Sequence, residues 1–416
     1  MNQPPLSIAV VGAGPVGLAL ALLAARTLPQ ARISLFDARA PERDVSADPR
    51  ALALALGSVQ LLERLGAWDP SRAEPIREVW VSQQTAAAAG PAWLGRASVR
   101  LSAAELGLPM LGAVLPYGAL VAPMQRAWEA VAASDPQRLH SRFGAAVSAL
   151  KDLPGGVEVD ADVAERFDLA VVAEGGVFGT DMVADVKHDY GQNAWVGSVT
   201  LAGSRPGLAV ERFTRHGPVA LLPLPALPSA AALAGQGSAP AAQRASLVWC
   251  VPQQDDPVRD LGDSQRMAVL NTLFDAEVGR IESVSPLKCF ALGLAAQRSL
   301  VRHRQVRIGN AAQTLHPVAG QGLNLGLRDA YALATALRDA VEAHRAAPDM
   351  DRALARVAWQ RAPDRWAMIA ATDFLARSFT WQAPGVAALR GLGMAVLQAL
   401  PPVKNALARR MMFGSR

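Results

Sequence analysis

Three glycine residues near the start of the chain, Gly12, Gly14 and Gly17, have the spacing of a turn that can hold a diphosphate. They follow the apolar run Ile8–Val11 and lead into a second apolar stretch. A diphosphate binds at a helix N-terminus only where backbone N–H groups can approach it. Gly12 would permit the tight turn, Gly14 would leave space for the phosphates, and Gly17 would let the helix pack on the strand.

Asp37 completes this pattern. It ends another largely apolar run, Ile33–Phe36, and lies twenty residues after Gly17. A carboxylate at that position can accept hydrogen bonds from a ribose. This order of elements predicts a βαβ unit that binds a dinucleotide: a strand, a glycine turn, a helix, a second strand and an acidic residue. Three further residues of the turn are expected to line the same site: Ala13, Pro15 and Val16.

The same segment has an alternative interpretation, because residues 8–25 are apolar and uncharged, as in a signal peptide or a membrane span. No basic segment precedes it, and its length is at the lower limit for a span. Pro15 and the three glycines also interrupt it early. We therefore favour the dinucleotide site and expect a cytoplasmic protein.

The composition argues against several other functions. The 416 residues, 51% of them hydrophobic, suffice for two domains or for one large domain with an appended lobe. The formal net charge is +5, but the arginines are dispersed and few aromatics lie among them, so we expect no nucleic-acid partner. A mildly basic surface would suit an anionic membrane or a phosphorylated cofactor. Cys250 and Cys289 match no zinc spacing and the six histidines no ligand pair, which predicts free thiols and no metal.

Along the chain, two apolar runs at 167–173 and 306–309 have the pattern of buried parallel strands. Short segments rich in β-branched and aromatic residues predict a separate antiparallel lobe, at 195–201, 208–214, 219–224 and 246–251. The Ala/Gly/Ser/Pro-rich stretch 226–244 is typical of a disordered loop. Helices are expected at 123–133, 264–277 and 323–343, and residues 351–416 are expected to be helical with breaks at Pro363, Pro384 and Pro401.

The segment 309–329 is the most specific part of the sequence. It begins at the end of an apolar strand, continues through a loop with several glycines, and ends in the first turns of a helix. The positive end of that helix would point at whatever binds beside the loop.

With both segments in view, the chain resembles the flavoprotein aromatic hydroxylases with one FAD-binding domain, and more narrowly the ubiquinone-biosynthesis hydroxylase family. The runs Gly-Asn-Ala-Ala-Gln-Thr-Leu-His-Pro at 309–317 and Ala-Gly-Gln-Gly-x-Asn-x-Gly-x-x-Asp at 319–329 match that family closely. Residues 50–68, 211–214, 217–218 and 221–224 match as well. The resemblance covers almost the whole chain.

This resemblance implies an α/β fold, α+β overall, like that of para-hydroxybenzoate hydroxylase: a Rossmann-like FAD-binding domain, an antiparallel substrate lobe and C-terminal helices. The FAD-binding domain would comprise 1–75, 105–182 and 300–345. The substrate lobe would comprise 76–104 and 183–299, and the C-terminal helical region 346–416.

The resemblance also implies roles for individual residues. The three early glycines would hold the FAD pyrophosphate, Asp37 the adenosine ribose, and Asn310 would lie near the ribityl chain where the superfamily usually has Asp. Arg50 would lie against the flavin, although its position in the sequence is equally consistent with a surface arginine paired with Asp48. The isoalloxazine ring would be lined by Pro317, Gly320, Gln321, Gly322, Leu323 and Asn324.

Two departures from the superfamily pattern stand out. Where Asp-Gly followed by Ser or Arg is usual, this chain has Glu-Gly-Gly-Val-Phe at 174–178, which makes the handling of NAD(P)H less certain. The helix after Pro116 usually carries an Arg or Gln against the flavin. Gln125 and Arg126 are the nearest candidates, and the register between them stays open.

The implied reaction needs no catalytic triad, because the cofactor carries the chemistry. NAD(P)H would reduce FAD, O2 would give a flavin C4a-hydroperoxide, and an electron-rich phenol would take one oxygen atom. His316 and Gln321 are the candidate catalytic residues. A histidine held by backbone hydrogen bonds before Pro317 is an equally good interpretation of His316, and Gln321 would more simply shape the loop.

The implied substrate is a lipophilic prenylated phenol, with O2 and other ubiquinone-biosynthesis proteins as further partners. The tail 403–413 mixes basic and apolar residues, so it would either lie on the inner membrane surface or pack on the FAD-binding domain. Two alternatives to a hydroxylase stay open: a non-hydroxylating flavoenzyme, and a flavin-binding subunit of a larger assembly. All of these interpretations require the two glycine-bearing bends to lie against one cofactor.

Overall fold

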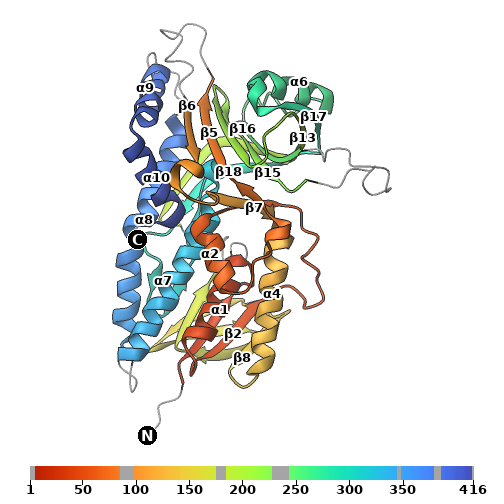
Figure 1. Cartoon of the computed structure of the whole chain (residues 1–416). Helices are drawn as coiled ribbons and strands as arrows, with labels where there is room; N and C mark the ends of the chain where they lie inside the picture. Colours follow the sequence, from red (N-terminus) through yellow and green to blue (C-terminus); the bar gives the residue numbers. More distant parts are fainter. Residues whose placement is uncertain are drawn as a thin grey trace.

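The computed structural model describes residues 5–84, 98–174, 184–226, 243–343, 348–378 and 386–414 (Figure 1). Most of the expected loop at 226–244 and the departure at 175–178 lie outside these residues. Among the helices described, none is long and apolar enough to cross a membrane.

A six-stranded sheet forms the base of the molecule, in the order β19-β20-β12-β1-β2-β8. Its inner strands pair in parallel, whereas the short edge strand β19 is antiparallel to β20. The strands are β1 (Ser7–Val11), β2 (Arg32–Asp37), β8 (Leu139–Phe143), β12 (Leu169–Val172), β19 (Val301–Arg302) and β20 (Gln305–Arg307).

The alternation of side chains along β1 explains why this strand is apolar throughout. Ile8 and Val10 pack toward the helices α1 (Pro15–Thr27), α4 (Tyr117–Ser134) and α7 (Gly322–Ala343). Ala9 and Val11 face the opposite side and pack on a small antiparallel sheet. That sheet comprises β9 (Ala149–Leu153), β10 (Gly156–Ala161) and β11 (Val163–Phe167).

A nine-stranded sheet forms the second lobe, in the upper half of Figure 1. Its main path is β21-β18-β13-β16-β15-β14-β5-β6, and β17 pairs with β13. The pairings are antiparallel except for β14 with β5. The strands are β5 (Glu78–Gln83), β6 (Ser98–Ser102), β13 (Val186–Ala202), β14 (Leu208–Thr214), β15 (Gly217–Leu224), β16 (Gln243–Pro252), β17 (Arg280–Val284), β18 (Lys288–Ala296) and β21 (Gln313–Thr314). The expected antiparallel lobe is thus confirmed, with α6 (Asp263–Leu273) on one face.

A third, three-stranded sheet joins the two lobes, in the order β3-β7-β4. It consists of β3 (Ala51–Ala55), β4 (Glu74–Ile76) and β7 (Gly112–Pro116), and α2 (Leu56–Arg64) follows β3 directly. Residues 51–55 were not predicted as a strand.

The C-terminal helices are α8 (Met350–Ser378), α9 (Val386–Ala399) and α10 (Pro401–Phe413). The predicted break at Pro363 is wrong, because α8 continues through this residue. The buried ion pair between Arg361 and Asp329 holds the helix against α7, and Arg361 also pairs with Asp364, one residue beyond the proline. Likewise α4 begins at Tyr117, six residues before the predicted start at Pro123. It therefore includes Pro123 as an internal residue. In both helices tertiary packing outweighs the local cost of proline.

Candidate functional site

The first glycine turn lies between β1 and α1. Gly12 has φ +102°, and a Cβ there would come within 2.8 Å of Glu174. A Cβ on Gly17 would lie 1.8 Å from the carbonyl oxygen of Gly12. Gly14 differs, because the nearest atom to a Cβ there is the Tyr117 hydroxyl oxygen at 3.8 Å. Gly12 and Gly17 therefore shape the turn, and the space in front of Gly14 is left open.

The start of α1 fits a phosphate group. Gly14 is the N-cap and has no side chain to cap the first N–H groups, and Pro15 opens the helix. The unsatisfied N–H groups of the first turn carry the positive end of the helix dipole. An open space at an uncapped helix N-terminus is what the diphosphate of FAD requires.

Asp37 fixes the other side of this turn. Its Oδ2 accepts a hydrogen bond of 2.6 Å from the Ala13 N–H, and its Oδ1 accepts one of 2.8 Å from the Arg39 N–H. The Arg39 guanidinium pairs with the carboxylate at 3.0 Å and donates to the Ala13 carbonyl at 2.9 Å. Burial raises the pKa of the Glu174 carboxyl, and the negative charge of nearby Asp37 raises it further. Arg39 was not predicted from the sequence, where its only signal is a cation two residues after Asp37.

The second glycine-bearing bend lies directly against the first. A Cβ on Gly309, which has φ +60°, would lie 3.1 Å from the Val16 side chain. A Cβ on Gly326 would lie 2.7 Å from the Gly309 Cα and 2.8 Å from Val16. Helices α1 and α7 thus pack closely at their first turns (Figure 1).

Asn324 anchors the second bend to β3. Its Oδ1 accepts from the Ala55 N–H at 2.7 Å and from the Ser58 hydroxyl at 2.8 Å. Its Nδ2 donates to the carbonyls of Ala53 and Gly320, each at 3.1 Å. The amide is buried and all of its donors and acceptors are used. Asn324 therefore positions the loop, and any contact from this position to a flavin would come from the backbone.

The loop before α7 leaves room beside its N-terminus. A Cβ added to Gly322 would meet no atom within 4 Å. The short helical turn Val318–Gly320 precedes it, and the Gln321 carbonyl accepts the Leu325 N–H at 3.0 Å. Gln321 itself is buried at the turn between these elements. Pro317 and Leu323 flank this turn, so the residues expected around the isoalloxazine ring share one loop.

Arg50 and Tyr117 stack at the edge of this region. The Arg50 guanidinium lies 4.4 Å from the centre of the Tyr117 ring and pairs with Asp48 at 2.8 Å. Burial raises the pKa of Tyr117, whose hydroxyl faces Gly14. The pairing expected for a surface arginine is thus present, and the stacked ring also places Arg50 beside the open space. Tyr117 was not predicted from the sequence, where its only signal is its position directly after the apolar run that forms β7.

Gln125 carries an unsatisfied buried acceptor. Its Nε2 donates to Glu129 at 3.0 Å, but its Oε1 is buried and has no hydrogen-bond partner among the residues described. A buried carbonyl without a protein donor is rare, and water or a ligand can supply the missing hydrogen bond. Arg126, the other candidate, is exposed. Contact between Gln125 and a cofactor stays a prediction.

His316 is buried, with 2% of its surface exposed, and both ring nitrogens are used. Nδ1 accepts the Val318 N–H at 3.2 Å, so Nε2 carries the proton and donates to Gln192 Oε1 at 3.0 Å. Burial lowers the pKa of the imidazole to about 4. The ring of Tyr190 packs edge-on at 5.2 Å, and its hydroxyl donates to Asp373 of α8 at 3.2 Å. A neutral imidazole with both nitrogens occupied favours a positioning role over a general base.

Asn310 lines a cavity of about 190 Å³ at the carboxyl ends of β12 and β20. Glu174, Lys187 and Arg307 line the same cavity. Burial lowers the pKa of Arg307, and the positive charge of nearby Arg302 lowers it further. Nucleotides bind at the carboxyl ends of parallel strands, so this location suits the cofactor's polar chain.

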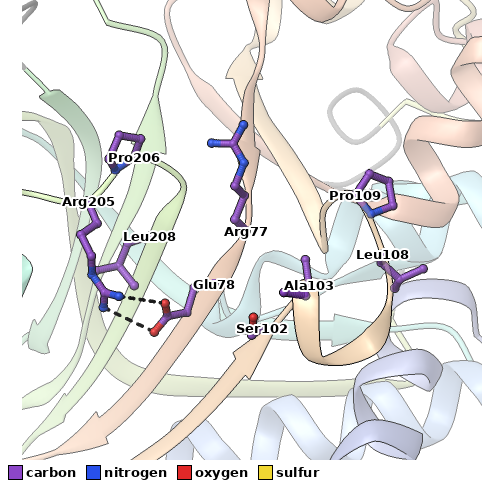
Figure 2. Close-up of a pocket in the computed structure, with 10 residues that line it drawn as sticks. Arg77, Glu78, Ser102, Ala103, Leu108, Pro109, Arg205, Pro206 and Leu208 are labelled. Carbon is purple, nitrogen blue, oxygen red and sulfur yellow. Dashed lines mark hydrogen bonds and ion pairs between the residues drawn. The ribbon is translucent and has the colours of Figure 1, made fainter.

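A separate pocket of about 260 Å³ lies on the second lobe (Figure 2). Arg77 points into it, and Arg205 pairs with Glu78 at 3.2 Å across its wall. None of the residues predicted for the cofactor lines this pocket, so we assign it no part in the site.

Comparisons with known proteins agree with this geometry. Residues 237–365 match a family model described as an FAD binding domain. A solved structure of Klebsiella pneumoniae HpxO, complexed with FAD and uric acid, superposes with a TM-score of 0.68 at 16% identity, covering 99% of this chain and 97% of that one. The fold is therefore that of FAD-dependent monooxygenases.

Two relatives define the family more narrowly. The ubiquinone hydroxylase UbiL of Rhodospirillum rubrum is 30% identical over 428 residues, which cover 97% of this chain and 89% of the relative. The 3-demethoxyubiquinol 3-hydroxylase of Escherichia coli is 29% identical over 414 residues, 95% of each chain. The chain belongs to the ubiquinone-biosynthesis hydroxylase family of FAD-dependent monooxygenases, which confirms the family inferred from the sequence.

Proposed function

We propose that this protein hydroxylates the aromatic ring of a polyprenylated phenol or quinol in ubiquinone biosynthesis, with NAD(P)H and O2 as co-substrates. The names of the two relatives support the substrate class. The structural observation that carries the proposal is the contact of the two glycine-bearing bends through Val16, Gly309 and Gly326. It allows one FAD to lie along both, with its diphosphate at α1 and its ring at the loop before α7.

Bound FAD would supply the redox chemistry, by accepting a hydride from the nicotinamide and passing one oxygen atom of O2 to the ring. The chain's own residues would bind and orient the groups. The N-terminus of α1 would hold the diphosphate at Gly14, and Asp37 would orient the ribose. The N-terminus of α7, beside Gly322, would stabilise negative charge that develops on the cofactor.

The second lobe would keep water away from the reacting atoms. Phe213 of β14 packs on Val318 of the flavin loop, together with Val81 and Leu375. Gln192 of β13 holds His316 at the base of the same loop. This sheet therefore covers the loop with apolar side chains. An apolar cover of this kind excludes water, which would otherwise react with the intermediates of the reaction.

We also propose a location on the cytoplasmic face of the inner membrane, because a polyprenylated phenol dissolves in lipid. Contacts with other proteins of ubiquinone biosynthesis belong to the same proposal. Use of NAD(P)H is typical of the family, and Glu174 borders the cavity next to Asn310 where a nicotinamide nucleotide would approach.

The test is turnover of a defined substrate by the purified, FAD-loaded protein. A prenylated phenol incubated with NADH or NADPH under ¹⁸O2 should gain one labelled oxygen atom. Complementation of strains that each lack one ring hydroxylase would then identify the ring position. Oxidation of NAD(P)H to give only hydrogen peroxide would favour a non-hydroxylating flavoenzyme. A protein that binds FAD but neither oxidises NAD(P)H nor restores any strain would favour a flavin-binding subunit.

A further inference from the structure

The helices α9 and α10 expose an unusual number of large apolar side chains. Ten such side chains are exposed among the residues that the structure describes; five of them lie on these two helices, and a sixth, Leu400, lies at the junction between them. We call these six the apolar stripe: Leu389, Leu392, Val396, Leu400, Val403 and Leu407. Each follows the previous one by three or four residues, so they share one face of each helix.

The opposite face of α10 is firmly packed. Ala408 and Met412 are buried against Leu56 and Val114. The Lys404 ammonium is buried and pairs with Glu105 at 3.0 Å. Because α10 is already fixed by its inner face and α9 by its contacts with β6, the stripe does not serve the core. Exposed apolar patches of this kind mark surfaces that bind a membrane or another protein.

The charge of this segment favours a membrane over a protein. After Asp373 the sequence contains no acidic residue and six basic ones: Arg377, Arg390, Lys404, Arg409, Arg410 and Arg416. Arg409 and Arg410 are exposed at the end of the stripe. Apolar side chains bordered by the exposed cations Arg409 and Arg410 suit an anionic bilayer.

The position of the stripe suits a substrate that arrives from lipid. Figure 1 shows α9 and α10 end to end along one edge of the molecule, with α9 beside the second lobe. The Arg100 N–H of β6 donates to Gln398 of α9 at 3.0 Å. A bilayer that contacts the stripe would therefore lie next to the sheet that covers the flavin loop.

We propose that the apolar stripe and its neighbouring cations dock the protein on an anionic bilayer, with α9 and α10 lying in the interface plane. The substrate route rests on the proposed function, whereas the docking itself does not. Helices of 14 and 13 residues are too short to span a membrane, but they suit interfacial binding.

The test compares matched variants in vesicle co-sedimentation. The double variant Leu392→Ser with Val403→Ser removes two members of the stripe without adding charge. Val163→Ser is the control, because Val163 is 68% exposed but lies on β11 of the base. FAD content and hydroxylation of a short-tailed, water-soluble phenol should be the same in all proteins, which separates docking from the proposed function.

Wild type and Val163→Ser should bind vesicles of phosphatidylcholine with phosphatidylglycerol better than pure phosphatidylcholine, and added salt should weaken this binding. The double variant should bind at least about tenfold more weakly, because it loses two apolar side chains that would insert into the bilayer. Equal binding of the double variant and the wild type would overturn the proposal. So would a concentration-dependent dimer, detected by sedimentation, that the double variant abolishes.

Discussion

His316 Nε2 lies 3.0 Å from Gln192 Oε1, so one buried hydrogen bond joins the flavin loop to the long strand β13 of the second lobe. The bond requires a neutral imidazole, because Nδ1 must stay free to accept the Val318 N–H. Protonation would break that second bond and place a charge in a buried site. The loop is therefore held in place by the uncharged form of His316.

His316 should make stability sensitive to acid. Its pKa in the folded protein is about 4, below the 6.5 of a free imidazole, so the unfolded chain binds the proton more readily. The stabilising contribution is complete above pH ~6.5 and is lost as the pH falls toward ~4. Between pH 7 and pH 5 the free energy of unfolding should fall by about 2 kcal/mol more in wild type than in His316→Asn. Urea unfolding at both pH values measures this difference.

The exposed His188 provides the control, since His188→Asn should retain the full acid sensitivity of wild type. Turnover by His316→Asn should drop without a change in the shape of the pH profile between pH 6 and 8. If His316 is instead the general base, the acidic limb of that profile will disappear in the variant.

Gly14→Val should give a folded protein that does not retain FAD. Gly14 has φ −76°, which any residue can adopt, and the space beside it is open in the protein itself. A valine there would occupy the place of the diphosphate. The measurement is flavin absorbance after gel filtration, together with circular dichroism of the same sample.

Gly17→Ala provides the contrast, because its Cβ would lie 1.8 Å from the Gly12 carbonyl oxygen. It should lose both FAD and a cooperative melting transition. A yellow Gly14→Val protein would refute the diphosphate assignment.

Asn324→Asp should destabilise the protein by about 2–4 kcal/mol. The change removes both donors and turns a carboxylate oxygen toward the carbonyls of Ala53 and Gly320, in a site with 2% of the residue exposed. Thermal unfolding of the apoprotein measures the loss. Asn310→Asp, at an exposed position, should change stability by less than ~0.5 kcal/mol. Similar melting of the two variants would show that the Asn324 amide does not anchor the loop.

Removing the buried pair Asp329–Arg361 should cost more than removing an exposed pair of the same kind. Asp329 is fully buried, and its Oδ1 lies 2.8 Å from Arg361 Nε. Asp329→Ala should cost about 3–5 kcal/mol, because Arg361 keeps its charge in a buried site. Asp339→Ala, which removes the half-buried partner of Arg338 and Arg356 at the surface, should cost less than ~1 kcal/mol. Guanidinium unfolding distinguishes these values, and equal costs would mean that the buried network is relaxed by water.

The sequence was sufficient to predict the features that depend on local spacing. The glycine turn, the acid at Asp37 and the buried apolar strands follow from patterns within about thirty residues. The family followed from the segment 309–329. The residue bounds assigned to the domains stay a prediction, as do the individual contacts to FAD.

Features that depend on distant partners could not be predicted in this way. The strand β3 is short and partly exposed, and it forms because β7 and Asn324 supply its hydrogen bonds. The link from Tyr190 to Asp373 joins residues 183 positions apart. Helix α8 passes Pro363 because of ion pairs to another helix. No local pattern encodes such contacts. For the same reason, the places of Tyr117 and Arg39 in the site could not be predicted.

The contact of Gly326 and Gly309 with Val16 also has a consequence for biosynthesis. Val16 emerges from the ribosome early, but its packing partners belong to the last third of the chain. The strand β20, which completes the parallel sheet beside β12, is also made late. Because such non-local pairings form slowly, a nascent chain that stops before α7 should expose the apolar faces of α1 and β1. The site that needs both bends would therefore form only after α7 has been made, and FAD would be captured only after that point.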